Sequence, residues 1–354
     1  MGLLGDSSAD FQAAQINEQH FQDASETPGT LLRITPYKQN EGIQSGARLL
    51  QAIHDVTTER KRLFSTKNVS DHHSFELWFD EGRVKFFMHA ATDDAADKYT
   101  TRVENAYDNS DVHEVDDGDG FPPVGADDYV AAAELDIERH HFYPIRHHDG
   151  EGFEHDPYSE ITSEMQSTEE TRVVVQAVFR PEPKDWAEDD GSSMIGSGVS
   201  VDDVAQSLRD DEVEGWFDPY TTEASKKDKD AAKIVEQQRG KYAFNTNLRI
   251  IAISPDEYEA ESRCEGVAGM FTRYYNSKTE QGFEANPVGE GRLSSVIESA
   301  QQREWTDHEM ILTIDELAGA AHIPNDEINV ANIDWKNTQR GSRVPADSLQ
   351  SDKD

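Results

Sequence analysis

Apolar residues recur along this chain in blocks with the period of a helix or a strand, and acidic turns separate the blocks. Residues 74–80 alternate, so three apolar side chains share one face of a predicted strand. The tight turn at 80–83 leads into a second run at 84–89, which predicts a β-hairpin. The other predicted elements of this block are a strand at 30–36, a helix at about 44–56, a helix beginning at Asp93 and a strand at 111–115.

The order strand, helix, two hairpin strands, helix, strand is that of a ferredoxin-like (βαββαβ) split unit. A second block repeats this theme more loosely. Its predicted strands are 129–139, 171–181 and 241–254, and its predicted helices are 156–165, one opening at Pro255 and Asp256, and one near 294–303. We expect the two long Val- and Ile-rich strands, 171–181 and 241–254, to pair. The predicted fold class is therefore α+β, with two ferredoxin-like units.

Composition shifts divide the chain into segments. Residues 1–28 are polar and predict a flexible lead-in, and a Gly- and Asp-rich stretch predicts a linker at 117–128. The second unit contains a charged, Gly- and Ser-rich insertion in which Ser200 caps one predicted helix. The predicted organisation is a lead-in at 1–28, a first unit at 29–116, a linker at 117–128, a second unit at 129–335 with its insertion at 187–230, and a polar tail or linker at 336–354.

The charge balance excludes several kinds of partner. The chain has 71 Asp and Glu against 33 Lys and Arg, a formal net charge of -38. Direct binding to nucleic acid is not expected, because phosphate contacts require clustered basic residues. Such acidity also repels an anionic membrane surface. It is typical of a protein that works in concentrated salt, as in haloarchaea, where ions screen the repulsion; an acidic protein of an ordinary cell is the alternative.

The remaining global features favour a cytoplasmic protein. There is no run of 18 or more apolar residues and no recognisable secretory signal. The single cysteine, Cys264, excludes an internal disulfide and a cysteine-based zinc site.

Motifs of nucleotide and hydrolase chemistry are absent from the sequence. It contains no G-x-x-x-x-G-K-[ST] loop, no dinucleotide fingerprint, no G-x-S-x-G elbow and no H-E-x-x-H pair. The Gly-rich stretch 191–198 lacks the lysine that reaches nucleotide phosphates. We therefore expect neither catalysis nor a cofactor from this chain.

Two clusters leave alternatives open. Histidines gather between residues 140 and 156, interleaved with carboxylates, and imidazole and carboxylate are competent metal ligands. The candidate metal ligands are His140, His147, His148 and His155. A metal-dependent hydrolase is the corresponding alternative function, and ordinary solvated histidines are the other interpretation. The basic stretches 60–62 and 226–229 predict either contacts to phosphate or an acidic partner, or solvated helix ends.

A series of short motifs resembles the amino-terminal region of HerA/TraC-like translocation ATPases. The motifs are the hairpin segments 74–79 and 83–88, the run 107–115, residues 142–145 and 156–157, the stretch 174–186, the strand 244–252, Phe283, and the run 312–318 with 322–324. In that family the last motif lies just before the ATPase core, and the nucleotide-binding loop that follows it there has no counterpart in this sequence.

The resemblance implies a non-catalytic assembly or docking module of a conjugation-type or type IV secretion-type ATPase. The implied partner is a motor ATPase, as a linked domain or a separate subunit, through which the chain forms a homo-oligomer. Docking to a membrane channel protein, with peripheral attachment at the inner face of the membrane, is also implied. The residues implied at the motor junction are Leu312, Glu316, Leu317, His322 and Pro324. A structural protein of a haloarchaeal virus or plasmid is a further alternative.

Overall fold

A computed structural model gives the arrangement of the chain. It describes residues 10–16, 29–60, 66–116, 120–148, 152–188, 199–210, 212–214, 220–308, 310–328 and 332–336. The strands are β1 (Ala13–Gln15), β2 (Thr30–Thr35), β3 (Thr58–Arg60), β4 (Thr66–Asn68), β5 (His73–Asp80), β6 (Arg83–Ala90), β7 (Asp111–Glu114), β8 (Tyr129–Ile137), β9 (Arg172–Pro181), β10 (Glu212–Glu214), β11 (Tyr220–Thr222), β12 (Ala243–Ser254), β13 (Phe283–Pro287) and β14 (Ile311–Thr313). The helices are α1 (Ile43–Ile53), α2 (Asp93–Ala106), α3 (Tyr158–Met165), α4 (Val201–Ser207), α5 (Lys226–Glu236), α6 (Glu257–Met270), α7 (Glu290–Gln301) and α8 (Ile314–Ala320).

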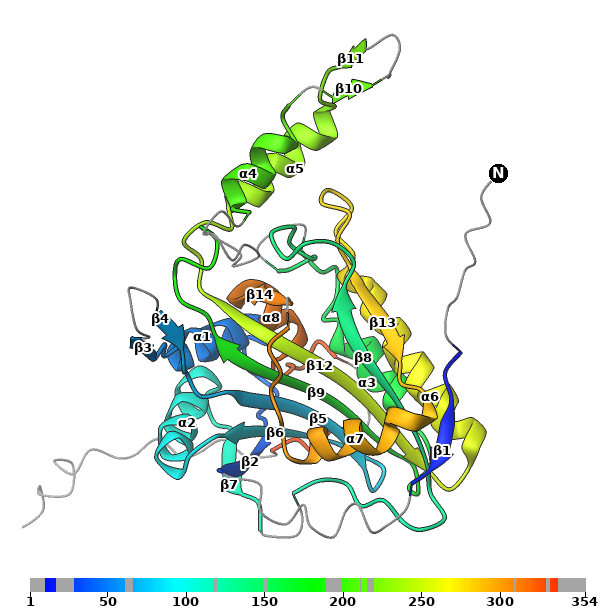
Figure 1. The fold of residues 1–354 in the computed structure, drawn as a ribbon. Coiled ribbons are helices and arrows are strands. Elements are labelled where there is room, and N and C mark those ends of the chain that lie inside the picture. The colour runs from blue at the N-terminus through cyan, green and yellow to red at the C-terminus, as the bar shows by residue number, and fades with distance from the viewer. Residues whose placement is uncertain are drawn as a thin grey trace, which may run out of the picture.

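The fold is α+β, as predicted, and is built on one large antiparallel sheet (Figure 1). Its ten strands run in the order β1-β8-β12-β9-β5-β6-β2-β7, with β13 also paired to β8 and β14 to β12. The predicted pairing of the two long apolar strands is confirmed, because β9 and β12 pair along most of their length. None of the described helices is both long and apolar enough to cross a membrane.

Strands from both halves of the chain belong to this sheet. Those of the first half lie in the order β7-β2-β6-β5, and those of the second half in the order β13-β8-β12-β9. The halves meet where β5 pairs antiparallel with β9, with Glu76 opposite Gln176. The predicted boundary between residues 29–116 and 129–335 is therefore crossed by a continuous ladder of backbone hydrogen bonds.

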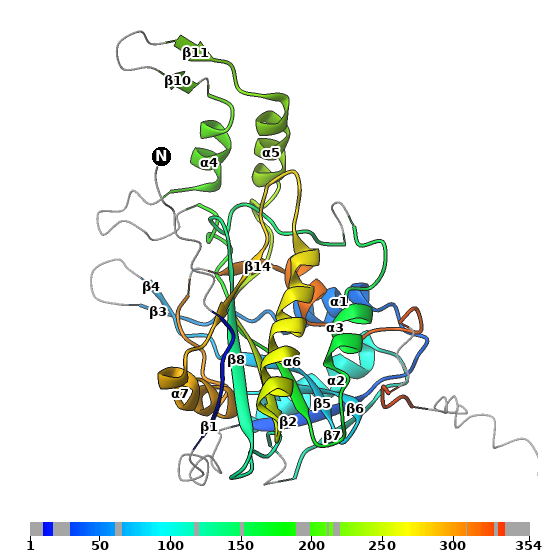
Figure 2. The ribbon, with the colours of Figure 1, turned by 90° about the vertical axis from the view of Figure 1, so that its right-hand side faces the viewer.

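The two faces of the sheet are covered differently (Figure 2). Helices α1, α2, α3 and α6 lie on one face, over a core that includes Phe79, Phe179 and Ile250. Helix α7 covers the other face over a smaller apolar group that includes Trp78, Val174 and Ile251. Alternate residues of the same strands supply these two cores, because successive side chains of a strand point to opposite faces.

Local sequence signals explain several element boundaries. The β5–β6 connection is a two-residue turn in which Glu81 and Gly82 both have positive φ, which the twist of a hairpin favours. Thr92 caps α2 and Asp256 caps α6 through side-chain oxygens that accept backbone N–H groups. The predicted cap of the insertion helix is also confirmed, because Ser200 forms a capping box with Asp203 at the start of α4.

The insertion between β9 and β12 forms an arm made of α4, β10, β11 and α5, which projects from the body of the molecule (Figures 1 and 2). Its foot is apolar, with Trp186 and Phe142 against Val201 and Val235. The sequence predicted α4 but not α5, whose polar first turn was recognised only as a basic stretch.

Parts of the predicted lead-in and of the predicted linker pack against the sheet. Within the lead-in, β1 pairs with β8 and Ile16 is buried. The sequence pattern did not predict this strand, because a strand this short carries no periodic signal and its partner is distant in sequence. Within the linker, Phe121 packs near Trp78, with ring centroids 6.0 Å apart. Of the predicted tail, Lys336 pairs with Asp111, and the residues after it lie outside the described part.

Candidate functional site

The five implied junction residues lie in residues 310–324, here called the junction segment, which contains β14 and α8. All five are buried in this chain: Leu312, Glu316, Leu317, His322 and Pro324. β14 pairs with the first residues of β12, and α8 packs against α1. The segment is thus part of the core of the body. Within the described stretch 310–328, the exposed residues are Asp326 and Glu327, in the turn after the segment.

Glu316 begins the network that holds α8. With Thr313 it forms a capping box, accepting hydrogen bonds from the Thr313 N–H (2.9 Å) and hydroxyl (2.6 Å). Its other oxygen accepts from the N–H of Ile145 at 2.9 Å, so the carboxyl group also fixes the loop after β8. Burial raises the pKa of Glu316 to about 7, although these hydrogen bonds favour the charged form.

Two tyrosines satisfy the carbonyl groups at the other end of α8. Tyr158 donates to the carbonyl of Ala320 at 2.8 Å, and Tyr274 donates to that of Gly319 at 2.7 Å. The last carbonyls of a helix have no partner within the helix, so buried side-chain donors stabilise this end. The hydroxyl of a third tyrosine, Tyr107 at the end of α2, acts instead as an acceptor and binds the N–H of Ile323 at 3.0 Å.

Asp156 and His322 form a buried pair where α1, α3 and α8 meet. His322 Nε2 lies 3.1 and 3.0 Å from the two Asp156 oxygens, and its ring stacks on Tyr158. Burial opposes ionisation of Asp156, but the charge and hydrogen bond of His322 outweigh it and hold the pKa of the carboxyl below its ordinary value. Gly46 permits the close approach of α1, because a Cβ there would lie 2.7 Å from His322 Cβ. This acid–base pair is closed off from solvent, so its geometry suits a structural clamp.

The predicted histidine cluster is not assembled as a metal site in the described residues. His155 is exposed, whereas His147 is buried. His140 and His141 have ring centroids 4.2 Å apart and lie near the apolar foot of the arm. Among the residues that the structure describes, no three His, Cys, Asp or Glu side chains converge on a point where they could hold a metal. Asp149 and Glu151 of the predicted cluster lie outside those residues.

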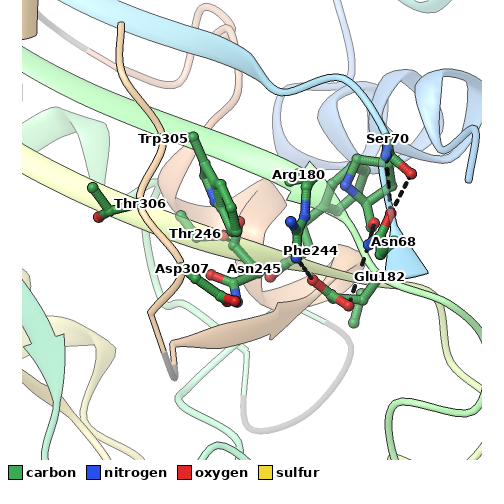
Figure 3. Close-up of polar contacts among 12 residues, drawn as sticks. Asn68, Ser70, Arg180, Glu182, Phe244, Asn245, Thr246, Trp305, Thr306 and Asp307 are labelled. Carbon is green, nitrogen blue, oxygen red and sulfur yellow. Dashed lines mark hydrogen bonds and ion pairs between the residues drawn. The ribbon is translucent and has the colours of Figure 1, made fainter. Parts of the chain in front are cut away.

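A polar cluster lies where β9 and β12 lead into the arm (Figure 3). The guanidinium of Arg180 is stacked 3.8 Å from the ring centre of Trp305 and donates to Glu182 at 3.0 Å. Asn68, from β4, donates to the backbone carbonyl of Pro181 at 2.8 Å. Burial raises the pKa of Glu182, although Arg180 favours its charged form. The cluster therefore connects the foot of the arm with the β3–β4 hairpin.

The connection from α7 to β14, residues 302–308, crosses the sheet beside this cluster and is here called the strap. Trp305 Nε1 donates to the carbonyl of Asn245 at 3.1 Å, and Asn245 donates to Asp307 at 3.2 Å. Asn247 both accepts the N–H of Thr306 at 2.8 Å and donates to its carbonyl at 3.0 Å. The strap is thus held by hydrogen bonds to amide side chains of β12, which occupy positions where an apolar face would be expected.

A buried ion pair joins the strap to the sheet. Arg303 Nε donates to Glu76 at 2.7 Å, and the two side chains are 2% and 0% exposed. Glu76 also accepts from the hydroxyl of Ser74 at 2.5 Å and the indole N–H of Trp78 at 3.0 Å. The alternation of residues 74–80 places Glu76 on the face opposite the three apolar side chains, but it does not predict this ion pair, because Arg303 lies 227 residues away.

Arg249 extends this buried polar group across the sheet. It lies next to Gln176 in register, donates to that side chain at 3.2 Å, and donates to the carbonyl of Glu304 at 2.8 Å. Burial lowers the pKa of Arg249, partly offset by nearby carboxylates. Glu76, Gln176 and Arg249 occupy consecutive registered positions on β5, β9 and β12, so the polar row spans the joint between the two halves.

A comparison with known protein families shows to which family the chain belongs. The family model described as a domain of unknown function, DUF8128, matches residues 6–336. The chain belongs to this family. The match covers both halves of the sheet, the arm and the junction segment. No curated protein matches the sequence.

The pKa of Glu316 predicts a pH dependence of stability. Because the folded state raises this pKa from 4.5 to about 7, folding favours the protonated carboxyl, and stability should fall as pH rises between these values. The difference between these two pKa values corresponds to a fall of at most about 3.5 kcal/mol in the free energy of unfolding, at about 1.4 kcal/mol per pH unit. Glu316→Gln should remove this contribution to the pH dependence of the free energy of unfolding, measured by urea unfolding between pH 4.5 and 7.5.

A matched control is Glu290→Gln, at an exposed carboxyl in the first turn of α7. It should retain the wild-type pH dependence. If both variants retain it, Glu316 titrates alike in the folded and unfolded states, and the prediction is wrong.

Proposed function

We propose that the chain is a non-catalytic assembly and docking module of a HerA/TraC-like translocation ATPase, of the conjugation or type IV secretion type. We further infer that its two halves are ferredoxin-like units. The strand orders β7-β2-β6-β5 and β13-β8-β12-β9 support this inference, since each follows the pattern fourth-first-third-second for a βαββαβ run. On this basis the arm is an insertion in the hairpin of the second unit.

The observation that carries the proposal is the construction of the junction segment. The family-like motif at 312–324 is held by the hydroxyl groups of Tyr107, at the end of α2, and Tyr158, on α3, and by a backbone N–H of the loop after β8. The exposed acidic turn of Asp326 and Glu327 lies just after it. A motor joined or docked at this turn would be attached to the rigid core of the module. Such an attachment suits a module that positions a motor.

The proposal includes a setting and a partner. The net charge of -38 favours concentrated salt and disfavours direct contact with nucleic acid, so the transferred substrate would be handled by the motor. The motor ATPase would be a linked domain or a separate subunit. Docking of the assembly to a membrane channel would then place the module at the inner face of the membrane.

Native purification tests this proposal. The tagged chain, purified at multi-molar salt from the cell that makes it, should appear with a stoichiometric ATPase or within a longer polypeptide that contains one. If the ATPase is a separate subunit, Asp326→Lys combined with Glu327→Lys should reduce the amount that co-purifies by more than about tenfold, since reversed charges at a contact weaken binding. Both residues are exposed, so the fold should be unaffected.

The matched control is Asp97→Lys combined with Glu284→Lys, which reverses two exposed charges on α2 and β13. This variant should co-purify with as much ATPase as the wild-type chain. A lone 39.7 kDa chain without any ATPase would contradict the proposed function. Equal loss from both variants would show that the turn at 326–327 is not the contact.

A further inference from the structure

The arm presents two helix surfaces that the other described residues do not cover. α4 and α5 pack side by side, and each turns its small apolar residues toward the other. These buried residues are Val201, Val204 and Ala205 on α4, and Ala231, Ala232 and Val235 on α5. Since the two helices bury their facing sides, their exposed sides point in opposite directions.

The two exposed sides carry opposite charge. On α4 and the turn after it, Asp203 and Asp210 are exposed. On α5, Lys226, Lys229 and Lys233 are exposed at helical spacing. α5 contains four lysines against three acidic residues, in a chain whose net charge is -38.

Contacts within the chain leave part of this charge available. Lys233 pairs with Asp230 at 2.9 Å, and Lys227 pairs with Glu280 on the body. Neither Lys226 nor Lys229 is within ion-pair distance of a carboxylate in the part of the chain that the structure describes. The exposed lysines of α5 can therefore attract an acidic surface of another molecule.

We propose that copies of this chain associate head to tail through the arm, with the acidic side of α4 in one copy against the lysine side of α5 in the next. The binding partner is a second copy of this chain, because the same arm carries both complementary faces. Because the faces point in opposite directions, one neighbour cannot engage both in the same way, so the contact is heterologous and leads to a ring or an open chain. The net charge of each copy is -38, and the resulting repulsion disfavours contacts between copies that do not bring opposite charges together.

Raising the salt should weaken the association without abolishing it, since the screening length falls from about 8 Å at 0.15 M ionic strength to about 3 Å at 1 M, which still spans ion pairs in direct contact. An apolar contact would strengthen with excluded salts such as sulfate. Sedimentation velocity of the purified full chain across this range, with unfolding measured in parallel, distinguishes the two kinds of contact.

Complementary variants test the pairing of the two faces. Lys226→Glu with Lys229→Glu removes the basic face and leaves the acidic one. Asp203→Asn with Asp210→Asn removes the acidic face; asparagine keeps the acceptors used by Ser200 and Gln206. Each variant alone should be a monomer, with its self-association weakened more than about tenfold.

A mixture of the two variants should form a 1:1 complex that grows no further, because only one intact face remains on each partner. This outcome would support the head-to-tail contact independently of any ATPase. A wild-type chain that stays monomeric at all salt concentrations would overturn it. It would also be overturned if the lysine variant dissociates while the aspartate variant associates normally, since the lysines would then contact an acidic surface other than α4.

Discussion

Replacing Arg303 by methionine is expected to lower the free energy of unfolding by about 3–5 kcal/mol, the usual cost of removing one partner from a buried ion pair. Glu76 is fully buried, and without Arg303 its carboxylate retains, among the described residues, the donors of Ser74 and Trp78. An uncompensated charge in that position is more costly than the lost hydrogen bonds alone. Denaturant unfolding at constant salt measures the change.

Arg292→Met is the matched control, because Arg292 also links the α7 region to the sheet through a glutamate, Glu134. That pair is exposed, with side chains 65% and 37% accessible, so its loss should cost about 1 kcal/mol or less. Adding Glu76→Gln to Arg303→Met should recover much of the stability, since the buried charge is removed. Similar small losses from Arg303→Met and Arg292→Met would show that the Glu76 pair does not hold the strap.

His322→Ala is expected to cost about 3–5 kcal/mol, because it leaves the Asp156 carboxylate buried without its partner and opens a cavity beside Tyr158. The loss should depend little on salt, since a buried pair is poorly screened. Thermal or denaturant unfolding of both proteins at low and high salt tests this. Asp156→Asn should cost less, because it keeps acceptor and donor groups while removing the charge.

The Asp156–His322 pair should also affect how stability changes at low pH. The folded state depresses the pKa of Asp156, so its contribution is present above the ordinary value near 3.8 and is lost as pH falls through the folded pKa. Wild-type protein should therefore lose more stability below about pH 4 than His322→Ala. His308→Ala, at the half-exposed pair with Asp136, serves as the control and should have a small effect. Identical acid profiles for wild type and His322→Ala would contradict this role.

The elements that sequence reasoning recovered are those with strong local signals. The β5–β6 hairpin, α2 and α6 each combine an apolar period with a turn or cap that lies within a few residues. Such signals are local, so they can be recognised without knowing what the element packs against. The elements that were missed, such as β1, β13 and the β3–β4 hairpin, are short or lie at edges. Their strand conformation depends on backbone partners supplied by distant segments.

The candidate site shows the same division. The resemblance indicated residues 312–324 as a site, but it did not show their partners, two of which, Tyr158 and Asp156, lie more than 150 positions away. The buried charges under the strap were missed altogether. Glu76 appears polar and solvent-facing in an alternating strand, and only the path of the strap across the sheet buries it.

The sequence by itself determined the fold class, the β5–β6 hairpin, helices such as α2 and α6, the strong negative charge and the lack of a nucleotide-binding loop, because these follow from composition and near-neighbour patterns. Only the tertiary structure decided that both halves share one sheet, that the predicted linker packs on it, that the junction segment is buried, and that the insertion projects as an arm. These features depend on the pairing of residues far apart in the chain. Such pairing is selected by the total burial and hydrogen bonding of the folded molecule, and local patterns do not encode it.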